Sequence, residues 1–192
     1  RDVAPSRGLG DVYKRQYIGG ENMTEKELIR LSKKGNKQAF AELYGLYKNR
    51  LYRYACYRLG NTYDAQDAVC DTVVCAYEQI GSLKKASAFS AWIFKIHHAT
   101  CSKYITRQIE TRENAHLDDF KNSAKLSQEL STLSIELNEG LNILNDQERA
   151  IVLLSVIAGF KSKEISAVTG LTDGAVRSKL SRSLAKLREF LE

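Results

Sequence analysis

The chain has one proline in 192 residues and no apolar run long enough to cross a membrane. Its longest apolar run, residues 150–158, has nine residues and includes a serine, whereas a spanning helix needs about 20. Proline breaks helices, so its scarcity leaves long stretches free to follow a helical period. These absences argue against insertion into a membrane and favour an all-α protein of the cytoplasm.

Cysteine is also scarce, and no two cysteines have the CxxC spacing. The four are Cys56, Cys70, Cys75 and Cys101. Because they fall inside helical patterns, we expect small buried apolar residues in a reducing compartment. The one cluster similar to a metal site is His97, His98 and Cys101, and no second ligand pair accompanies it. We therefore expect neither a metal nor a cofactor.

Charge is distributed unevenly along the chain, whose net charge is +6. Residues 23–108 hold 14 Lys/Arg and 7 Asp/Glu, whereas residues 109–140 hold 3 and 7. Residues 141–192 hold 8 and 6. Two basic blocks thus flank an acidic connector, a distribution that suits a polyanionic partner.

Residues 1–16 have no helical period and no apolar face, and Met23 is the only methionine. The segment from Gly10 to Gln16 is similar to translated sequencing-adapter read-through. We expect residues 1–22 to be a non-native or disordered leader. A capping box formed by Thr24 and Glu27 follows Met23 directly, so we expect the biological chain to start there.

Period-3.6 patterning predicts four helices in the first half, at about residues 24–34, 37–59, 62–80 and 89–106. Gly60 is placed to end the second helix, and Asn61 or Thr62 to cap the third. The apolar stripe of the second helix includes one cation, Arg58. We expect one compact helical domain over residues 23–108.

Residues 109–128 are polar and weakly periodic, which predicts a flexible linker. A second helical domain is expected over residues 129–192, with helices at about 129–144 and 146–158. Asn145 and Glu148 form a capping-box-like pair at the start of the second of these. The fold prediction is two small helical domains joined by a linker.

Residues 165–187 have the pattern of a helix-turn-helix: an amphipathic helix, a short turn containing Gly170, and a longer basic helix. Thr172 is placed to cap the second helix. The predicted core-facing stripe of that helix is Val176, Leu180, Leu184, Leu187 and Leu191.

The remaining faces of this helix are basic. Residues 173–189 hold five Lys/Arg and two acids. A cationic helix after a short glycine-containing turn is typical of a helix that enters a DNA groove.

Three stretches of the chain resemble the sigma-70 family of RNA polymerase specificity subunits, in particular its small two-domain extracytoplasmic function (ECF) type. Residues 64–71 (DAQDAVCD) are similar to its DAEDxVQE-like segment, and residues 89–96 (FSAWIFKI) to its FxxWLxxI segment. Residues 159–182 are similar to its GFSxxEIA…GTVxSRLxR segment. The stretches occur in the family's order and at its spacings.

The resemblance implies that residues 23–108 bind core RNA polymerase and the minus-ten promoter element. The expected polymerase contacts are Asp64, Gln66, Asp67 and Asp71, where the carboxylates at 64, 67 and 71 share one helix face. The family implies that the loop over residues 81–88 captures a flipped base. The expected minus-ten contacts are Lys84, Lys85, Phe89, Trp92, Lys95 and Lys103, with Trp92 open between the core and stacking on DNA.

The resemblance also implies that residues 129–192 read the minus-35 element. The expected contacts are Lys161, Lys163, Arg177, Ser178, Ser181 and Arg182, the two lysines on phosphates and the others in the major groove. The two promoter elements lie about 25 base pairs, or ~85 Å, apart. The polar segment over residues 107–128, about 22 residues, spans at most ~70–80 Å when extended, which suffices once the width of each domain is added.

The family implies one further partner, an anti-sigma factor that covers the polymerase-binding surfaces. Two other readings of the sequence stay open. One is a helix-turn-helix regulator whose N-terminal domain senses a ligand or protein. Residues 60–108 distinguish it from a sigma factor, because a sensor needs no acidic docking face. The other is an enzyme using Cys101 with His97 or His98, for which no orienting group is evident.

Overall fold

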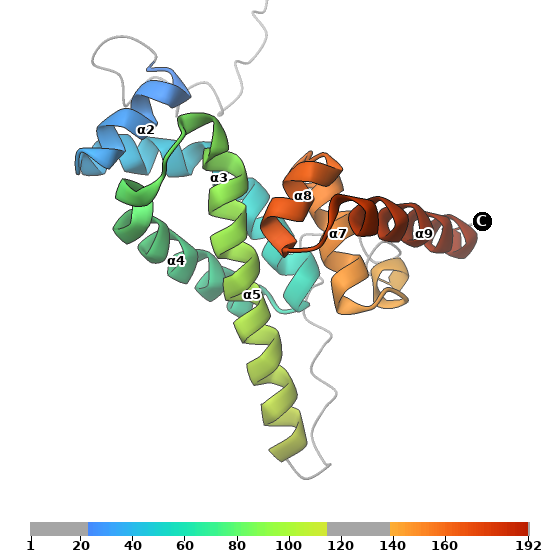
Figure 1. Ribbon diagram of the computed structural model, residues 1–192. Coiled ribbons are helices and arrows are strands. Elements are labelled where there is room, and N and C mark those ends of the chain that lie inside the picture. Colours follow the sequence, from blue (N-terminus) through green and yellow to red (C-terminus); the bar gives the residue numbers. More distant parts are fainter. Residues whose placement is uncertain (1–22, 115–138, 192) are drawn as a thin grey trace, which may run out of the picture.

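The computed structural model describes residues 23–114 and 139–191, and in these ranges the regular structure is helical (Figure 1). In chain order the elements are α2 (Glu25–Lys33), α3 (Lys37–Leu59), α4 (Thr62–Gln79), the 3₁₀ turns η1 (Ile80–Ser82) and η2 (Ala86–Ala88), α5 (Phe89–Asn114), α7 (Asp146–Val156), α8 (Ser162–Thr169) and α9 (Asp173–Leu191). The all-helical prediction is confirmed.

Local capping explains where the first helices begin. The Thr24 hydroxyl accepts a hydrogen bond from the Glu27 amide at 3.3 Å, and the Glu27 carboxylate accepts one from the Thr24 amide at 2.8 Å. Asn36 and Asn61 cap α3 and α4 with their side-chain oxygens. Gly60 ends α3 with φ of 67°, a left-handed conformation that glycine adopts without strain.

Helices α2 to α5 form an N-terminal module around a common core. Helix α3 packs against α2, α4 and α5, and α4 packs against α5. The core is apolar and aromatic, with Leu43, Tyr54, Ile93 and Phe94 fully buried. Edge-on aromatic contacts such as Tyr54 with Phe94, at 6.0 Å between ring centroids, add to this packing.

Helices α7 to α9 form a C-terminal module. Asn145 and Glu148 make the predicted capping box at the start of α7, with hydrogen bonds of 2.9 and 3.2 Å. Ile151, Leu154 and Ile165 are fully buried between the three helices. Lys186 of α9 contacts Glu148 at 2.9 Å and links the two ends of the module.

The two modules pack directly against each other: α5 lies along α8, and α3 contacts α7 (Figure 1). Phe94 of α5 and Phe160, just before α8, meet edge-on at 5.2 Å between ring centroids. Arg58 of α3 donates to the Asp146 carboxylate at 2.9 Å. The buried apolar residues of both modules therefore form one continuous cluster.

Helix α5 is longer than the sequence analysis predicted. It continues to Asn114, past the expected end near Thr106 and into the segment assigned to the linker. Residues 107–114 are rich in arginine, glutamine and glutamate, which favour helix even without an apolar stripe. Gln108 also donates to the Asp64 carboxylate of α4 at 2.6 Å, which holds this extension against the module.

The predicted apolar stripe of α9 was wrong at Leu184. Val176, Ser183 and Leu187 are buried, whereas Leu184 is 42% exposed. Successive steps of four residues rotate gradually around a helix, so a position eight residues after Val176 lies about 80° off its face. A position seven residues after it is only about 20° off, which places the serine inward instead.

Three expectations lie outside the described residues. These are the leader over residues 1–22, the linker from residue 115 onward, and most of the helix expected at residues 129–144, of which residues 139–142 are helical. No helix of the described residues is long and apolar enough to cross a membrane.

Candidate nucleic-acid and protein interfaces

The outward face of α9 presents the four side chains expected to reach a DNA groove. Arg177, Ser178, Ser181 and Arg182 are all exposed. Two of them are oriented by their own helix: Arg177 lies 3.5 Å from the Asp173 carboxylate, and Arg182 Nε donates to the Ser178 carbonyl at 3.3 Å. The buried opposite face of α9 fixes the direction in which this cationic surface points.

The turn between α8 and α9 is held by short hydrogen bonds. Gly170 adopts φ of 77°, and its amide donates to the Ser166 carbonyl at 2.9 Å. The Ser166 hydroxyl donates to the carbonyl of Leu171 at 2.6 Å. The Thr172 hydroxyl accepts from the Ala175 amide at 3.3 Å, as predicted for a cap. This turn sets the angle between the two helices.

Two lysines stand at the start of α8. Lys161 and Lys163 are exposed, and the Lys161 amide donates to the Glu164 carboxylate at 2.9 Å. The glutamate thus satisfies one of the orphan amides of the helix terminus, and both ammonium groups face solvent.

The acidic face of α4 is partly tied to α5. Asp64 accepts from Gln108 at 2.6 Å, and Asp71 accepts from the Tyr104 hydroxyl at 3.0 Å. Burial and this hydrogen bond to Asp71 raise the pKa of Tyr104 to about 12, so the phenol stays protonated and donates. Gln66 and Asp67 are exposed on the same helix. This face of α4 is therefore acidic, and hydrogen bonds from α5 hold two of its carboxylates in place.

The loop between α4 and α5 exposes two lysines over a buried anchor. Lys84 and Lys85 are exposed, while Leu83 is 4% exposed. The ammonium group of Lys33 in α2 donates to the Leu83 carbonyl at 2.6 Å and holds the loop. Further along, Lys95 and Lys103 are exposed on α5.

Phe89 is a core residue and not part of the exposed surface. It is 1% exposed, and its ring meets Tyr47 edge-on at 5.2 Å between centroids. Its expected contact with DNA is therefore not available in this conformation, because an aromatic ring stacks on a base only through an open face. Trp92 is half-buried and tilted against Phe89 at 5.7 Å, which leaves part of its surface accessible.

His97 and Cys101 are buried in the N-terminal module. The His97 ring nitrogens lie 2.8 Å from the Thr72 hydroxyl and 2.9 Å from the Leu51 carbonyl. Burial lowers the pKa of His97 to about 4 and raises that of Cys101 to about 12. A fully buried, protonated thiol is not an accessible nucleophile. In the part of the chain that the structure describes, no three or more His, Cys, Asp or Glu side chains lie close enough together to hold a metal ion.

The ion pair between Arg58 and Asp146 was missed by the sequence analysis. The Arg58 side chain is 1% exposed and that of Asp146 is 56% exposed. The signal in the sequence was a lone arginine on the apolar stripe of α3, which requires a partner when buried. The partner lies 88 residues away in the other module, and helical periodicity carries no information on such a distant contact.

Family models match parts of both modules. The family model described as Sigma-70 region 2 matches residues 43–110, and the model described as Sigma-70, region 4 matches residues 134–187. The chain is 27% identical to the ECF RNA polymerase sigma factor SigW of Bacillus subtilis, over 88% of this chain and 97% of that protein. It is 25% identical to SigM of Mycobacterium tuberculosis, over 91% and 88% respectively.

A solved structure has a similar fold. It is that of CnrH in complex with the cytosolic domain of CnrY, with a TM-score of 0.67 and 25% identity over 87% of this chain and 96% of CnrH. The matched regions occur in the same order as the two modules, and the relatives align over most of their length. The chain therefore belongs to the sigma-70 family of RNA polymerase sigma factors, as a member of the extracytoplasmic function type.

Proposed function

We propose that this chain directs promoter-specific initiation through two DNA-binding surfaces and one polymerase-binding surface. The observation that carries the proposal is the outward face of α9, where Arg177 and Arg182 stand exposed on a helix-turn-helix. Arginine makes bidentate hydrogen bonds to guanine in the major groove. This face reads the minus-35 element, with Ser178 and Ser181 between the two arginines and the Lys161 and Lys163 ammonium groups on phosphates.

The acidic surface of α4 binds core RNA polymerase. Asp67 and Gln66 are exposed there, and the hydrogen bonds from α5 fix the side chains of Asp64 and Asp71. Carboxylates fixed in this way lose little conformational entropy when they meet a basic surface.

The loop over residues 81–88 and the first half of α5 hold the minus-ten element. Lys84, Lys85, Lys95 and Lys103 supply exposed positive charge for the phosphates. The accessible part of Trp92 offers an aromatic surface beside them. Phe89 supports this surface from the core.

Promoter binding requires the two modules to separate. Helix α8 packs against both α5 and α9. In each of these two packings the helix axes lie roughly 8–10 Å apart. The two promoter elements are ~85 Å apart. The packed conformation is thus a state of the free protein.

The chain acts as a non-catalytic subunit and works in the cytoplasm, where polymerase and promoter DNA meet. An anti-sigma factor is a further partner: one similar fold was solved as the sigma factor RpoE bound to the anti-sigma factor NepR from Bartonella quintana, at 22% identity. That likeness concerns the fold, and the proposal of such a partner here rests on ECF membership.

Transcription with core RNA polymerase tests this proposal. The chain from Met23 is mixed with core enzyme and a library of random upstream sequences, and the templates that yield transcripts are sequenced. A two-part motif with a fixed spacing is the expected result. Binding of the chain to DNA without any dependence on core enzyme would instead support the helix-turn-helix regulator.

The same assay separates specificity from affinity at two side chains of the C-terminal module. Arg182→Ala is expected to remove ~1–3 kcal/mol of discrimination at one minus-35 base pair. Lys163→Ala is expected to weaken binding to all DNA sequences alike. In a titration of binding against salt, it is expected to lower the slope of log K against log salt by about 1. An unchanged minus-35 motif for Arg182→Ala would overturn the assignment of the groove-facing side.

A further inference from the structure

The loop between α4 and α5 consists of two short turns joined by an extended segment. The Leu83 amide donates to the Ile80 carbonyl at 3.2 Å and closes η1, and the Ala88 amide donates to the Lys85 carbonyl at 3.0 Å in η2. Between the turns, Leu83 and Lys85 are extended, with ψ of 114° and 128°. Extended backbone makes no hydrogen bonds along its own chain, so its buried polar groups need partners from other elements.

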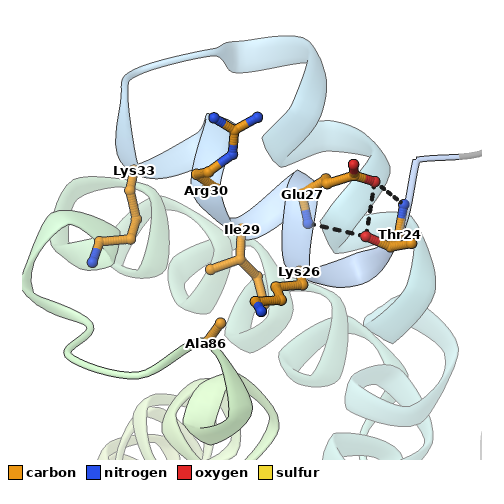
Figure 2. Close-up of a pocket in the computed structure, with 7 residues that line it drawn as sticks. All are labelled: Thr24, Lys26, Glu27, Ile29, Arg30, Lys33 and Ala86. Atoms are coloured by element: carbon orange, nitrogen blue, oxygen red, sulfur yellow. Dashed lines mark hydrogen bonds between the residues drawn. The ribbon is translucent and has the colours of Figure 1, made fainter.

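The partner of the Leu83 carbonyl is a side chain of α2. Leu83 is 4% exposed, and the Lys33 ammonium group donates to its carbonyl at 2.6 Å, across 50 residues of sequence. Figure 2 shows Lys33 reaching from α2 toward the loop, beside a pocket of about 480 Å³ that Ile29 and Ala86 also line. Because this pocket lies between α2 and the loop, close packing alone does not fix their separation, and the lysine bridges it.

Helix α2 is itself fixed to the N-terminal module. Leu28 and Ile29 are 4% and 2% exposed and belong to the common core. Near the start of the helix, the Tyr47 hydroxyl of α3 donates to the Glu25 carboxylate at 2.5 Å. A side chain on a well-packed helix holds its contacts more precisely than one on a loop. Lys33 therefore connects the loop backbone to the rigid part of the module.

We propose that Lys33 is a positioning residue for recognition of the minus-ten element. Its ammonium group contacts the protein and not the DNA. By holding the Leu83 carbonyl it sets the direction in which residues 84–88 leave the core, and these residues meet the unpaired base. A binding site discriminates between bases only when its groups are held within about 0.5 Å of the right geometry, so a loop released from α2 discriminates less. The inference rests on the proposed function, in which this loop holds the minus-ten element.

Hydrogen exchange of the free protein tests the contact itself. Lys33→Met keeps most of the unbranched stem and removes the donor, and Lys34→Met is the matched control because Lys34 is adjacent and exposed. Loss of one hydrogen bond is expected to make amide exchange at residues 83–88 about fivefold faster in Lys33→Met than in the control. Equal exchange rates in the two variants overturn the inference.

Promoter selection tests the consequence for specificity. Each variant is mixed with core RNA polymerase and a library randomised at both promoter elements, and the templates that yield transcripts are sequenced. Lys33→Met is expected to lower the preference for the favoured base at one or more minus-ten positions about fivefold. The minus-35 motif and the slope of log K against log salt are expected to stay unchanged, and Lys34→Met to select the motif of the unsubstituted chain.

Three other results of the selection count against the inference. An unchanged minus-ten motif for Lys33→Met overturns it, even when the midpoint of thermal unfolding falls, because Lys33 then serves stability alone. Equal weakening on all sequences, with the salt slope lowered by about 1, also overturns it and assigns Lys33 to a phosphate. If the unsubstituted chain selects no two-part motif with core enzyme, the proposed function fails and the inference falls with it, whereas a motif shared by both variants overturns the inference alone.

Discussion

His97 places an imidazole inside the N-terminal module, where both ring nitrogens meet polar groups of neighbouring helices. The adjacent His98 contacts the Tyr54 hydroxyl at 2.8 Å. Burial lowers the pKa of each histidine to about 4, against an ordinary value near 6.5. The folded protein therefore holds both rings neutral at pH values where the unfolded chain binds protons.

This difference makes stability depend on pH. Between pH 6.5 and 4 both histidines become protonated in the unfolded state but stay neutral in the folded state. The free energy of unfolding therefore falls as the pH falls. At pH 5.5 the expected loss relative to pH 7 is about 1 kcal/mol for each histidine. Urea denaturation at the two pH values measures it, and His97→Gln is expected to show a smaller loss than the unsubstituted chain. An equal loss in both proteins would show that His97 does not contribute.

The turn between α8 and α9 is the element on which the orientation of the DNA-reading helix depends. Gly170 ends α8 with φ of 77°, a conformation that costs other residues about 1–2 kcal/mol. A Cβ there would meet no atom within 4 Å, so strain and not crowding sets the cost. Gly174 offers a matched control, because it lies within α9 and also has open space around it.

Gly170→Ala is expected to lower the midpoint of thermal unfolding by roughly 2–8 °C. Gly174→Ala is expected to raise it slightly, because alanine favours the helix by about 0.5–1 kcal/mol over glycine. Differential scanning calorimetry compares the two variants. If both shifted the midpoint in the same direction, the left-handed turn would not be the reason for glycine at residue 170.

Helix starts could be predicted from the sequence because capping is local. The Thr24–Glu27 and Asn145–Glu148 boxes each involve residues three apart, and both were found. The exposure of Leu184 could not be predicted in this way, since a short stripe at i, i+4 and i+8 drifts from the face that packing selects. The end of α5 depended on helix propensity and on a contact with α4, neither of which an apolar period reports.

The candidate sites also divide into residues that could be selected from the sequence and residues whose contacts depend on the fold. The resemblance to the sigma-70 family selected Arg177, Ser178, Ser181 and Arg182 of α9, and all four side chains are exposed. Phe89 could not be assigned, because a ring at helical spacing serves the core or the surface equally well until its neighbours are known. The pairing of Arg58 with Asp146 joins residues 88 apart and depends on how the modules meet.

At the scale of the whole molecule, the Arg58–Asp146 ion pair and the contact of Phe94 with Phe160 add to the apolar packing between the modules. Arg58 donates to Asp146 at 2.9 Å, and its Nε has no hydrogen-bond partner among the described residues. Because the Asp146 side chain is 56% exposed, water screens the pair, and we expect it to contribute about 1 kcal/mol.

Asp146→Asn is expected to shift the ratio of separated to packed molecules about fivefold toward separation. Small-angle X-ray scattering measures this as a larger radius of gyration. Asp173→Asn is the matched control, because Asp173 also begins a helix and pairs with an arginine but lies within one module. An identical radius for the two variants would mean that Arg58 and Asp146 do not hold the modules together.

The packing of α5 against α8 has a thermodynamic consequence for the partners of this protein. A ligand that binds only the separated form has its apparent affinity reduced by the fraction of molecules in that form. The first such ligand to bind bears this cost, and the second does not. Any other ligand that binds only the separated form is then positively coupled to promoter DNA, and by reciprocity each strengthens the binding of the other by the same factor.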